Sequence, residues 1–342
     1  MSEATIGAGV ALRLMQLAVS KGAIQAELER LSGISAADLV DQDARVSFAK
    51  YAELMRAGKR LCDDPALALH FGESADLSEL SVVGLLGGAS RSVLDGLAQL
   101  NRYSRLVVDV ETGGVDRFQI VRDAAGPWMV DMRINPNGFP EQTESTFARM
   151  VSSARRRSGA SFAKAIQVTH ADPGYKGEYD RIFGVPIAFE CDRNALLLED
   201  SWLDMKIPEQ PRYVFGVLSA RADALLRRLE DSKTFRGRVE SLLMPSLHRG
   251  DARIDAIAAE MKVSRWTLAR RLKEEGTTFA QVLDALRKEM AIHYLSGKKV
   301  SVGKAAYRVG FSEAAAFSRA FKRWTGMKPK EARAGLISPP RR

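Results

Sequence analysis

Two short segments near the C-terminus carry cationic and hydroxyl side chains at helical spacing. A guanidinium or hydroxyl group on an exposed helix face can bind base edges or phosphates, so these side chains indicate nucleic-acid recognition. The first segment, residues 265–275, exposes Arg265, Trp266, Thr267, Arg270 and Arg271. The second, residues 312–324, offers Ser312, Glu313, Ser318, Arg319, Lys322 and Arg323.

The position of each cation on its helix predicts its role. Arg270 and Arg319 are predicted to contact guanine O6 and N7. Trp266 has two interpretations, a core residue or a contact to the sugar–phosphate backbone, and its place at a helix start favours the second. Phosphate contacts, which orient a protein without specifying a sequence, are predicted for Arg265, Arg271, Lys322 and Arg323.

The same segments belong to two copies of a helix-turn-helix pattern, at residues 254–275 and 302–325. Ala258 and Ala306 each stand four residues before the turn, where a small side chain lets two helices cross closely. Gly310 suits a left-handed turn, whereas Lys262 at the equivalent place must carry that strain or adopt another turn. Ser264 and Ser312 are predicted to cap the following helices.

A long helix is predicted between the two copies. Thr278 and Gln281 form a capping-box pattern at its start, and Ser301 is predicted to cap the first helix of the second copy. Two recognition helices joined rigidly can enter successive major grooves on one face of double-stranded DNA, roughly 34 Å apart.

The charge distribution agrees with a polyanionic partner for this segment. Residues 241–342 hold 21 Lys and Arg against 9 Asp and Glu, a net charge of +12, whereas residues 1–240 have 30 against 33, a net charge of −3. Each Lys or Arg at a phosphate releases condensed counterions, which favours binding.

The segment from about residue 251 to 333 resembles the DNA-binding domain of AraC/XylS-type transcription regulators, on the motifs SRWTLARRLKEEG and VGFSEAAAFSRAFKRWTGMKP. The resemblance implies an all-helical domain in a transcription factor, most often an activator that contacts RNA polymerase. Two features depart from the family pattern. Three alanines, Ala314 to Ala316, replace polar side chains of the second recognition helix, and Ala332 replaces a frequent aromatic residue.

The N-terminal two-thirds predicts an α+β fold. Residues 1–104 have helical patterns, residues 105–111, 115–121 and 128–134 are predicted to form an antiparallel meander, and residues 141–157 form a helix. Strands at 165–170 and 186–191 are predicted around a helix at 175–183, a further strand is predicted at 194–198, and residues 213–229 form a final helix. The predicted organisation is therefore an α+β domain at 1–230 and an all-α domain at 231–342, with two helix-turn-helix units joined by a linker helix.

The stretch from residue 67 to about 203 resembles the sensor domain of the ornithine-utilisation and mycobacterial virulence-gene regulators, rather than the jelly-roll barrel of the arabinose regulator. The motifs are FGESADLSELSVVGLLGGASRSVLDGLAQLNRYSRLV and YDRIFGVPIAFECDRNALLLED. The resemblance implies a domain that binds an unknown small-molecule effector and forms a homodimer.

Polar groups on otherwise apolar elements are the candidates for effector binding. They are Tyr103, Arg133, Glu141, Glu144 and His170. The alternative for each is a solvated or locally paired side chain, and carboxylates at 141 and 144 also suit a helix N-terminus without any ligand.

Composition and motifs favour a regulator over an enzyme. The sequence has no GxSxG, GxxxxGK[ST] or HExxH motif, and Cys62 and Cys191 are predicted to be small core residues, so no catalytic residue, cofactor or metal is predicted. A DNA-repair methyltransferase is disfavoured because neither cysteine lies in a Pro-Cys-His context. An architectural protein that bends DNA without an effector is the remaining alternative. No signal peptide or membrane span is predicted, which indicates a cytoplasmic protein.

Overall fold

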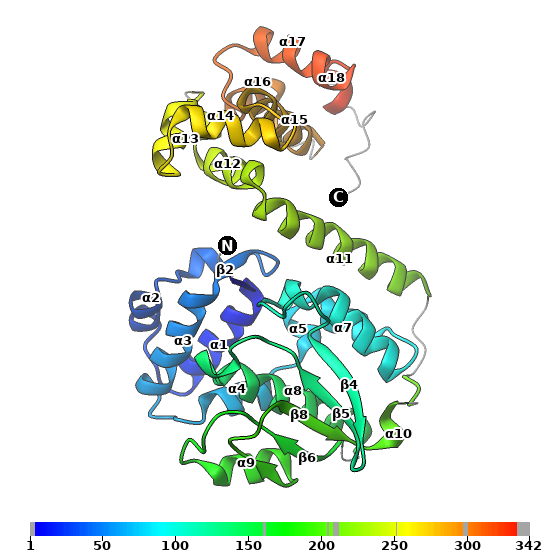
Figure 1. Cartoon of the computed structure of the whole chain (residues 1–342). Helices are drawn as coiled ribbons and strands as arrows, with labels where there is room; N and C mark the ends of the chain where they lie inside the picture. Colours follow the sequence, from blue (N-terminus) through cyan, green and yellow to red (C-terminus); the bar gives the residue numbers. More distant parts are fainter. Residues whose placement is uncertain are drawn as a thin grey trace. The chain divides into compact units, whose positions relative to one another are not determined.

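The chain forms two compact units, Met1–Leu226 and Arg227–Arg342. The computed structural model describes residues 4–159, 162–203, 205–207, 212–250, 252–296 and 300–333 (Figure 1). The boundary between the units lies inside one helix, α11 (Arg212–Lys233), and so does the boundary predicted at residue 230.

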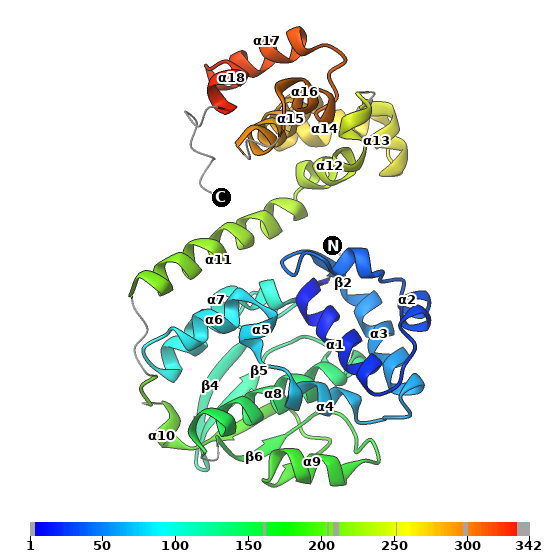
Figure 2. The ribbon, with the colours of Figure 1, turned by 180° about the vertical axis from the view of Figure 1, so that it is seen from behind.

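Unit 1 starts with a three-stranded antiparallel sheet in the order β2–β1–β3. A group of helices lies beside it, with α1 and α3 next to each other in both ribbon views (Figures 1 and 2). The elements are β1 (Thr5–Gly7), α1 (Ala8–Ser20), α2 (Gln25–Ser32), η1 (Ala36–Leu39), β2 (Arg45–Ser47), α3 (Phe48–Leu61), α4 (Leu67–Ser74), α5 (Leu77–Leu80), α6 (Val82–Gly88), α7 (Val93–Val107) and β3 (Val108–Asp109).

The second part of unit 1 is a five-stranded sheet in the order β4–β5–β8–β6–β7. Its neighbouring strands are antiparallel except β6 and β7. The elements are β4 (Phe118–Asp123), β5 (Gly126–Asp131), η2 (Pro136–Gly138), α8 (Glu141–Ser158), β6 (Ala163–Gln167), α9 (Lys176–Phe183), β7 (Ile187–Ala188), β8 (Asn194–Leu198) and α10 (Asp200–Leu203).

Helix α8 is the central element of unit 1, packed between the five-stranded sheet and α4 (Figure 2). The contact with α4 is very close, because a Cβ at Gly72 would lie 2.4 Å from the carbonyl oxygen of Ser145. Consequently α8 is buried over most of its length although its sequence is largely polar. Its polar side chains therefore face the interior of the unit.

Two predictions about the first strands were wrong in detail. Residues 105–107 continue helix α7, because Ser104 and Val107 extend the stripe that Leu97 and Leu100 begin. Strand β3 pairs with β1 in the other sheet, so the predicted three-stranded meander is in fact the hairpin β4–β5 beside β8. The α+β class itself is confirmed.

Unit 2 is all helical, as predicted. Phe235, Leu268, Leu272 and Val282 lie in one hydrophobic core, and Phe317 and Phe321 lie in a second one. Helix α15 contributes to both cores and so holds the two halves together. Beyond the end of α11, the elements are α12 (Phe235–Leu243), η3 (Met244–Arg249), α13 (Ile254–Glu260), α14 (Arg265–Glu274), α15 (Phe279–Ser296), α16 (Val302–Arg308), α17 (Ala314–Thr325) and α18 (Pro329–Glu331).

Cys62 and Cys191 are free thiols that are partly exposed, not the buried core residues that were predicted. Within the described parts of the chain, no helix combines the length and hydrophobicity that a membrane span requires.

Candidate nucleic-acid interface and ligand cavity

The first helix-turn-helix is formed by α13 and α14. Lys262 adopts a left-handed conformation, with φ of 53°, so this non-glycine residue carries the strain of the turn. Ser264 then caps α14, since its hydroxyl accepts a hydrogen bond of 3.0 Å from the backbone N–H of Thr267. Ala258 is buried at the helix crossing, as predicted.

The outer face of α14 carries an aromatic ring and several cations. Trp266 is 71% exposed, which excludes the core interpretation. The Arg270 guanidinium lies over the Trp266 ring at 5.4 Å from its centroid, and it also donates to Glu274 at 2.7 Å. Arg265 approaches Asp255 at 3.6 Å. Exposed ion pairs such as these stabilise a protein by only about 0.2–1 kcal/mol each. A phosphate or a base can therefore displace them.

Arg271 is placed differently from its neighbour. Its guanidinium lies 5.4 Å from the ring centroid of Phe235, a buried residue of α12. It therefore lies toward the helix that packs behind α14, which suits a contact to the DNA backbone better than one to a base edge.

The second helix-turn-helix is formed by α16 and α17. Gly310 has φ of 81°, and a Cβ there would lie 2.3 Å from the carbonyl oxygen of Leu247 in η3. The glycine is therefore required both by the turn and by this close packing. Ser301 caps α16 through the N–H of Lys304 at 3.2 Å.

The start of α17 differs from the prediction. The helix begins at Ala314, its N-cap residue is Glu313, and Glu313 makes no side-chain capping hydrogen bond. Ser312 therefore lies one residue too early to cap it. Both Ser312 and Glu313 are exposed, so they remain available to a ligand outside the helix.

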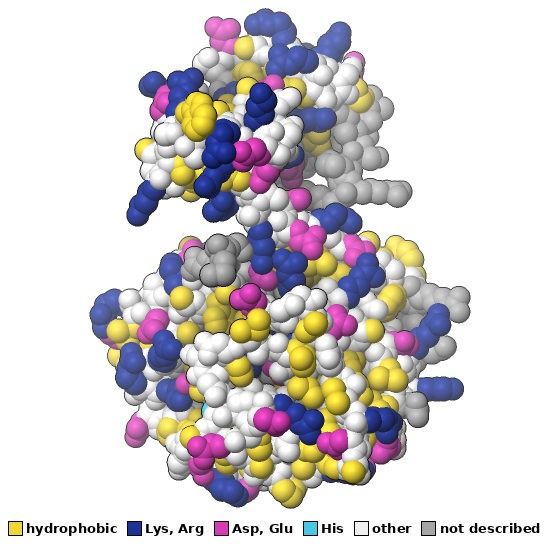
Figure 3. Space-filling model, viewed as in Figure 1, with side chains coloured by type: hydrophobic (Ala, Val, Ile, Leu, Met, Phe, Trp, Pro, Cys, Tyr) yellow, Lys and Arg dark blue, Asp and Glu magenta, His cyan; other side chains and the backbone are white. Residues whose placement is uncertain are grey.

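The outer face of α17 carries separated cations beside small side chains. Arg319 and Lys322 are exposed, and neither forms an ion pair within the described part of the chain. Arg323 pairs with Asp284 of α15 at 3.0 Å, and the Ser318 hydroxyl donates to the carbonyl of Ala314 at 2.8 Å. Lys and Arg side chains are numerous on the visible face of unit 2 (Figure 3).

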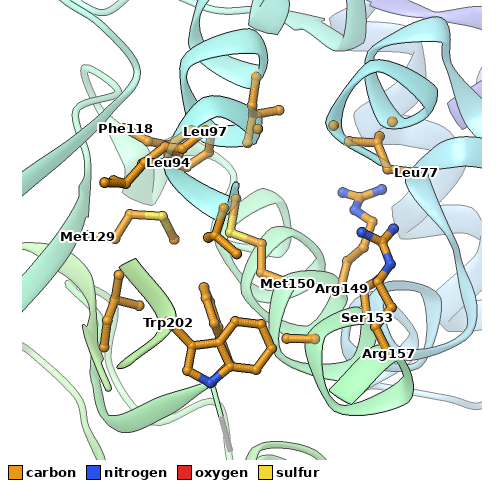
Figure 4. Close-up of a pocket in the computed structure, with 18 of the residues that line it drawn as sticks. Leu77, Leu94, Leu97, Phe118, Met129, Arg149, Met150, Ser153, Arg157 and Trp202 are labelled. Carbon is orange, nitrogen blue, oxygen red and sulfur yellow. The ribbon is translucent and has the colours of Figure 1, made fainter. Parts of the chain in front are cut away.

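Unit 1 contains a cavity of about 390 Å³ between α6, α7, α8 and the five-stranded sheet. Its apolar wall includes Leu97, Phe118, Met129, Met150 and Trp202. Figure 4 shows Arg149 and Arg157 on one side of this cavity, near Leu77, and Leu94, Phe118 and Met129 on the other. Most of the other lining residues are apolar. The polar ones are Ser104, Arg117, Gln142, Thr146, Arg149, Ser153, Arg157, Ser158 and Lys206.

Arg149 is the most unusual of these residues. It is 7% exposed, and its Nη1 atom has no hydrogen-bond partner. Its guanidinium lies 5.9 Å from the ring centroid of Phe71, and burial lowers the pKa of Arg149 to about 10, so it still carries a charge near neutral pH. An unsatisfied buried donor costs about 1–3 kcal/mol, and more when it is charged. Such a group is a functional-site candidate.

The five residues predicted to bind an effector do not line this cavity. Tyr103 donates to Asp223 at 2.7 Å, Arg133 donates to Asp131 at 2.8 Å, and Glu141 pairs with Lys59 at 3.1 Å. Each of these three thus has a local partner within unit 1. The residues that line the cavity, Arg149 above all, were missed by sequence reasoning.

Glu144 and His170, in contrast, are brought together around two tyrosines. Tyr175 and Tyr179 donate to Glu144 at 2.6 and 2.5 Å, and the His170 Nε2 atom lies 3.4 Å from the Tyr179 hydroxyl. Burial raises the pKa of Glu144 above its ordinary value, although both tyrosine hydrogen bonds oppose that shift. The cluster lies on the side of α8 that faces α9, and the second carboxyl oxygen of Glu144, Oε2, is buried there without a hydrogen-bond partner.

The described ranges contain no group of three or more His, Cys, Asp or Glu side chains that could hold a metal ion.

Comparisons with known proteins agree with this division of the chain. The family model "Arabinose-binding domain of AraC transcription regulator, N-term" matches residues 22–207, and a helix-turn-helix domain model matches residues 257–335. The ornithine utilization regulator of Pseudomonas aeruginosa is 25% identical over 295 residues, which are 85% of each chain. The transcriptional regulator VirS of Mycobacterium tuberculosis is 24% identical, over 86% of each chain.

Two more similarities are of narrower value. The transcriptional activator RhaS of Escherichia coli is 39% identical over 82 residues, 24% of this chain and 30% of that protein. The crystal structure of the regulator CdpR from Pseudomonas aeruginosa covers 79% of this chain and 87% of its own, at 24% identity and a TM-score of 0.36, too low to support a structural argument. Since the first family model spans more than half of the 342 residues, the chain belongs to the AraC family of DNA-binding transcription regulators.

Proposed function

We propose that this regulator is a transcription activator controlled by a small molecule that binds in the cavity of unit 1. The observation that carries the proposal is the cavity itself, which combines an apolar wall with a buried, unpartnered guanidinium at Arg149. Sites for small ligands have this composition, mostly apolar with a few convergent polar groups.

In the proposed complex, α14 and α17 enter two major grooves of the operator. Arg270 and Arg319 contact bases, and Arg265, Arg271, Lys322 and Arg323 contact phosphates, with Trp266 against the backbone. Thr267, Ser312, Glu313 and Ser318 complete the proposed DNA-binding set. The free side chain of Arg319 and the small, non-hydrogen-bonding Ala314–Ala316 methyl groups support a second helix that anchors the protein and discriminates less than the first.

Activation is proposed from the relative named an activator, RhaS, whose similarity lies in 82 residues. RNA polymerase as a partner and a homodimer through unit 1 stay predictions from the resemblance. The effector-independent architectural alternative gains no support, because a protein that only bends DNA has no need of a buried cation in a cavity.

Genome-wide mapping of binding sites tests the proposal first, since it supplies the operator sequence. Transcription from that operator is then measured in cells with the intact regulator and with a cavity-filling Ser153→Trp variant. The proposal predicts operator occupancy by both proteins and loss of effector-dependent transcription in the variant. Equal regulation by both proteins would favour the architectural alternative.

A further inference from the structure

We propose that the cavity of unit 1 takes an amphipathic monocarboxylate, with its carboxylate paired to Arg149 and its apolar body against Leu97, Phe118 and Met129. The inference rests on the proposed function, because it names the chemical class of the proposed effector. It is carried by the charges, burial and shape of the cavity.

The charge of the cavity wall is one-sided. Among the described residues that line it, four are cationic, Arg117, Arg149, Arg157 and Lys206, and none is an Asp or Glu. Buried charges are normally paired. Arg117 and Arg157 have acidic partners and Lys206 is exposed, so Arg149 is the lining cation that lacks a paired anion. A ligand that brings a negative charge supplies that missing partner.

Among the lining cations, Arg149 is the one that we expect to bind the negative charge of the ligand. Arg117 already reaches the buried carboxylate of Asp131 at 3.4 Å, and Arg157 is half exposed and lies 3.8 Å from Asp76. Arg149 forms no ion pair with a described carboxylate, although Asp76 acts on it electrostatically, and its Nη1 atom is buried without a partner. A guanidinium binds a carboxylate through two parallel hydrogen bonds, which is the strongest pairing open to it.

The surroundings of Arg149 reinforce this assignment. Asp131 is shared between Arg117 and Arg133, so that buried cluster already holds two guanidinium groups against one carboxylate. It has no negative charge to spare for Arg149. Asp76, which acts on Arg149 electrostatically, forms its ion pair with Arg157. A direct ion-pair partner for Arg149 is therefore left to a bound ligand.

The end of the cavity away from Arg149 is apolar, and it determines which chemical groups the rest of the ligand can carry. Leu94 and Leu97 of α7 lie there with Phe118 and Met129 of the sheet and with Trp202 (Figure 4), and Leu100 also lines the cavity. An alkyl or aryl group buried there is stabilised by about 25 cal/mol per Å² of apolar surface removed from water. A sugar fits poorly, because each buried hydroxyl needs a hydrogen-bond partner that this end does not provide.

A single unpaired guanidinium matches a monoanion rather than a phosphate monoester, which carries close to two charges. The cavity volume of about 390 Å³ lies in the ordinary range for small-molecule sites, roughly 300–1,000 Å³. Gln142 on the same helix offers a hydrogen-bond acceptor, since its Oε1 atom is buried without a partner. A hydroxyl or amide N–H on the ligand would satisfy it.

Calorimetric titration of the full chain with decanoate, decyl phosphate and 1-decanol tests the inference, with the two anions below their critical micelle concentrations and 1-decanol below its aqueous solubility. Decanoate is expected to bind roughly 10- to 100-fold more tightly than 1-decanol, and more tightly than decyl phosphate. Arg149→Met is expected to lower decanoate affinity by the same factor and to leave 1-decanol unchanged. Arg156→Met is the matched control, because it removes a cation from the exposed side of the same helix.

Equal binding of decanoate and 1-decanol by the natural protein overturns the inference, and so does a preference for decyl phosphate. An absence of binding by all three compounds, repeated with 4-phenylbutyrate as an aryl carboxylate, also overturns it. These results need no variant, so they hold even if Arg149→Met fails to fold. Decanoate binding that depends on Arg149 but leaves operator affinity unchanged supports the carboxylate site and contradicts the proposed effector control instead.

Discussion

The guanidinium of Arg270 lies over the exposed ring of Trp266, 5.4 Å from its centroid, on the outer face of α14. This stacking fixes the direction of a long side chain without burying its hydrogen-bond donors. The planar fork is thereby oriented before any contact with a base is made, which lowers the conformational entropy lost on binding.

Replacement of Arg270 tests its proposed base contact. Arg270→Ala is expected to weaken operator binding by about 1–3 kcal/mol and to relax preference at one base pair, because a bidentate contact to guanine is lost. Competition binding against operators with single base-pair changes measures both effects. A uniform loss across all sequences would identify Arg270 as a phosphate contact.

The partner of Arg270 provides the matched variant. Glu274→Gln removes the ion pair at 2.7 Å and leaves Arg270 in place. We expect the same base preference with equal or higher operator affinity, since the guanidinium no longer has to leave a carboxylate. Loss of base preference in this variant would mean that the ion pair itself positions Arg270 for recognition.

Lys322 tests the predicted phosphate contacts. A single phosphate contact contributes about one unit to the slope of log K against log salt concentration, so Lys322→Ala should reduce that slope by about one. Lys50→Ala is the control, because this exposed lysine of unit 1 binds the carbonyl of Gly33 instead. Identical slopes for the Lys322 variant and the natural protein would exclude the contact.

Alanine substitutions at two glycines of the second helix-turn-helix distinguish strain in the turn from the helix propensity of the residue. Gly310→Ala should lower the free energy of unfolding by at least about 1–3 kcal/mol, because a side chain there is strained at positive φ and would meet the backbone of Leu247. Gly303→Ala, in the adjacent helix with open space around it, should raise it by about 0.5–1 kcal/mol. Thermal unfolding of the full chain compares them, and a neutral Gly310→Ala would refute this account of the turn.

Sequence reasoning worked well where local signals decide structure. Three residues predicted at helix ends lie at helix ends in the structure. Ser264 is the N-cap of α14, Gly276 follows α14 in a left-handed conformation, and the Thr278 N–H donates to Gln281 at the start of α15. Ser312 shows the limit of such signals, because α17 begins two residues later and its cap position holds Glu313.

The ligand cavity could not be predicted for a different physical reason. Helix α8 is polar enough to be expected on the surface, and only its position between α4 and the sheet buries Arg149. Among the predicted effector-binding residues, Tyr103 bonds to Asp223, far away in the sequence, and Arg133 bonds to Asp131, two residues before it. Burial of a polar helix is a tertiary property that periodicity does not report.

The buried carboxyl of Glu144 predicts a pH dependence of stability. Its folded pKa is raised by burial, so its stabilising contribution is complete below the ordinary glutamate pKa of about 4.3 and is lost as pH rises through the folded value. Lys59 and His170 lie near enough to oppose this shift. Glu144→Gln lacks the titration, and its stability relative to the natural protein should therefore increase with pH, by up to about 1.4 kcal/mol per unit.

Urea unfolding of both proteins at about pH 5 and about pH 8 measures the difference. Tyr175 and Tyr179 can still donate to the amide oxygen of the variant, so the polar network is retained. Parallel stability curves for the two proteins would show that Glu144 does not titrate differently in the folded state.

The central claim is that a ligand in the cavity of unit 1 controls DNA binding by unit 2. Operator affinity of the full chain, titrated with decanoate, tests it most directly when the natural protein is compared with Arg149→Met. We predict a change of roughly 5- to 150-fold in operator affinity for the natural protein, the usual size of such coupling, and none for the variant. An operator affinity that stays constant while decanoate saturates the cavity of the natural protein would contradict the account.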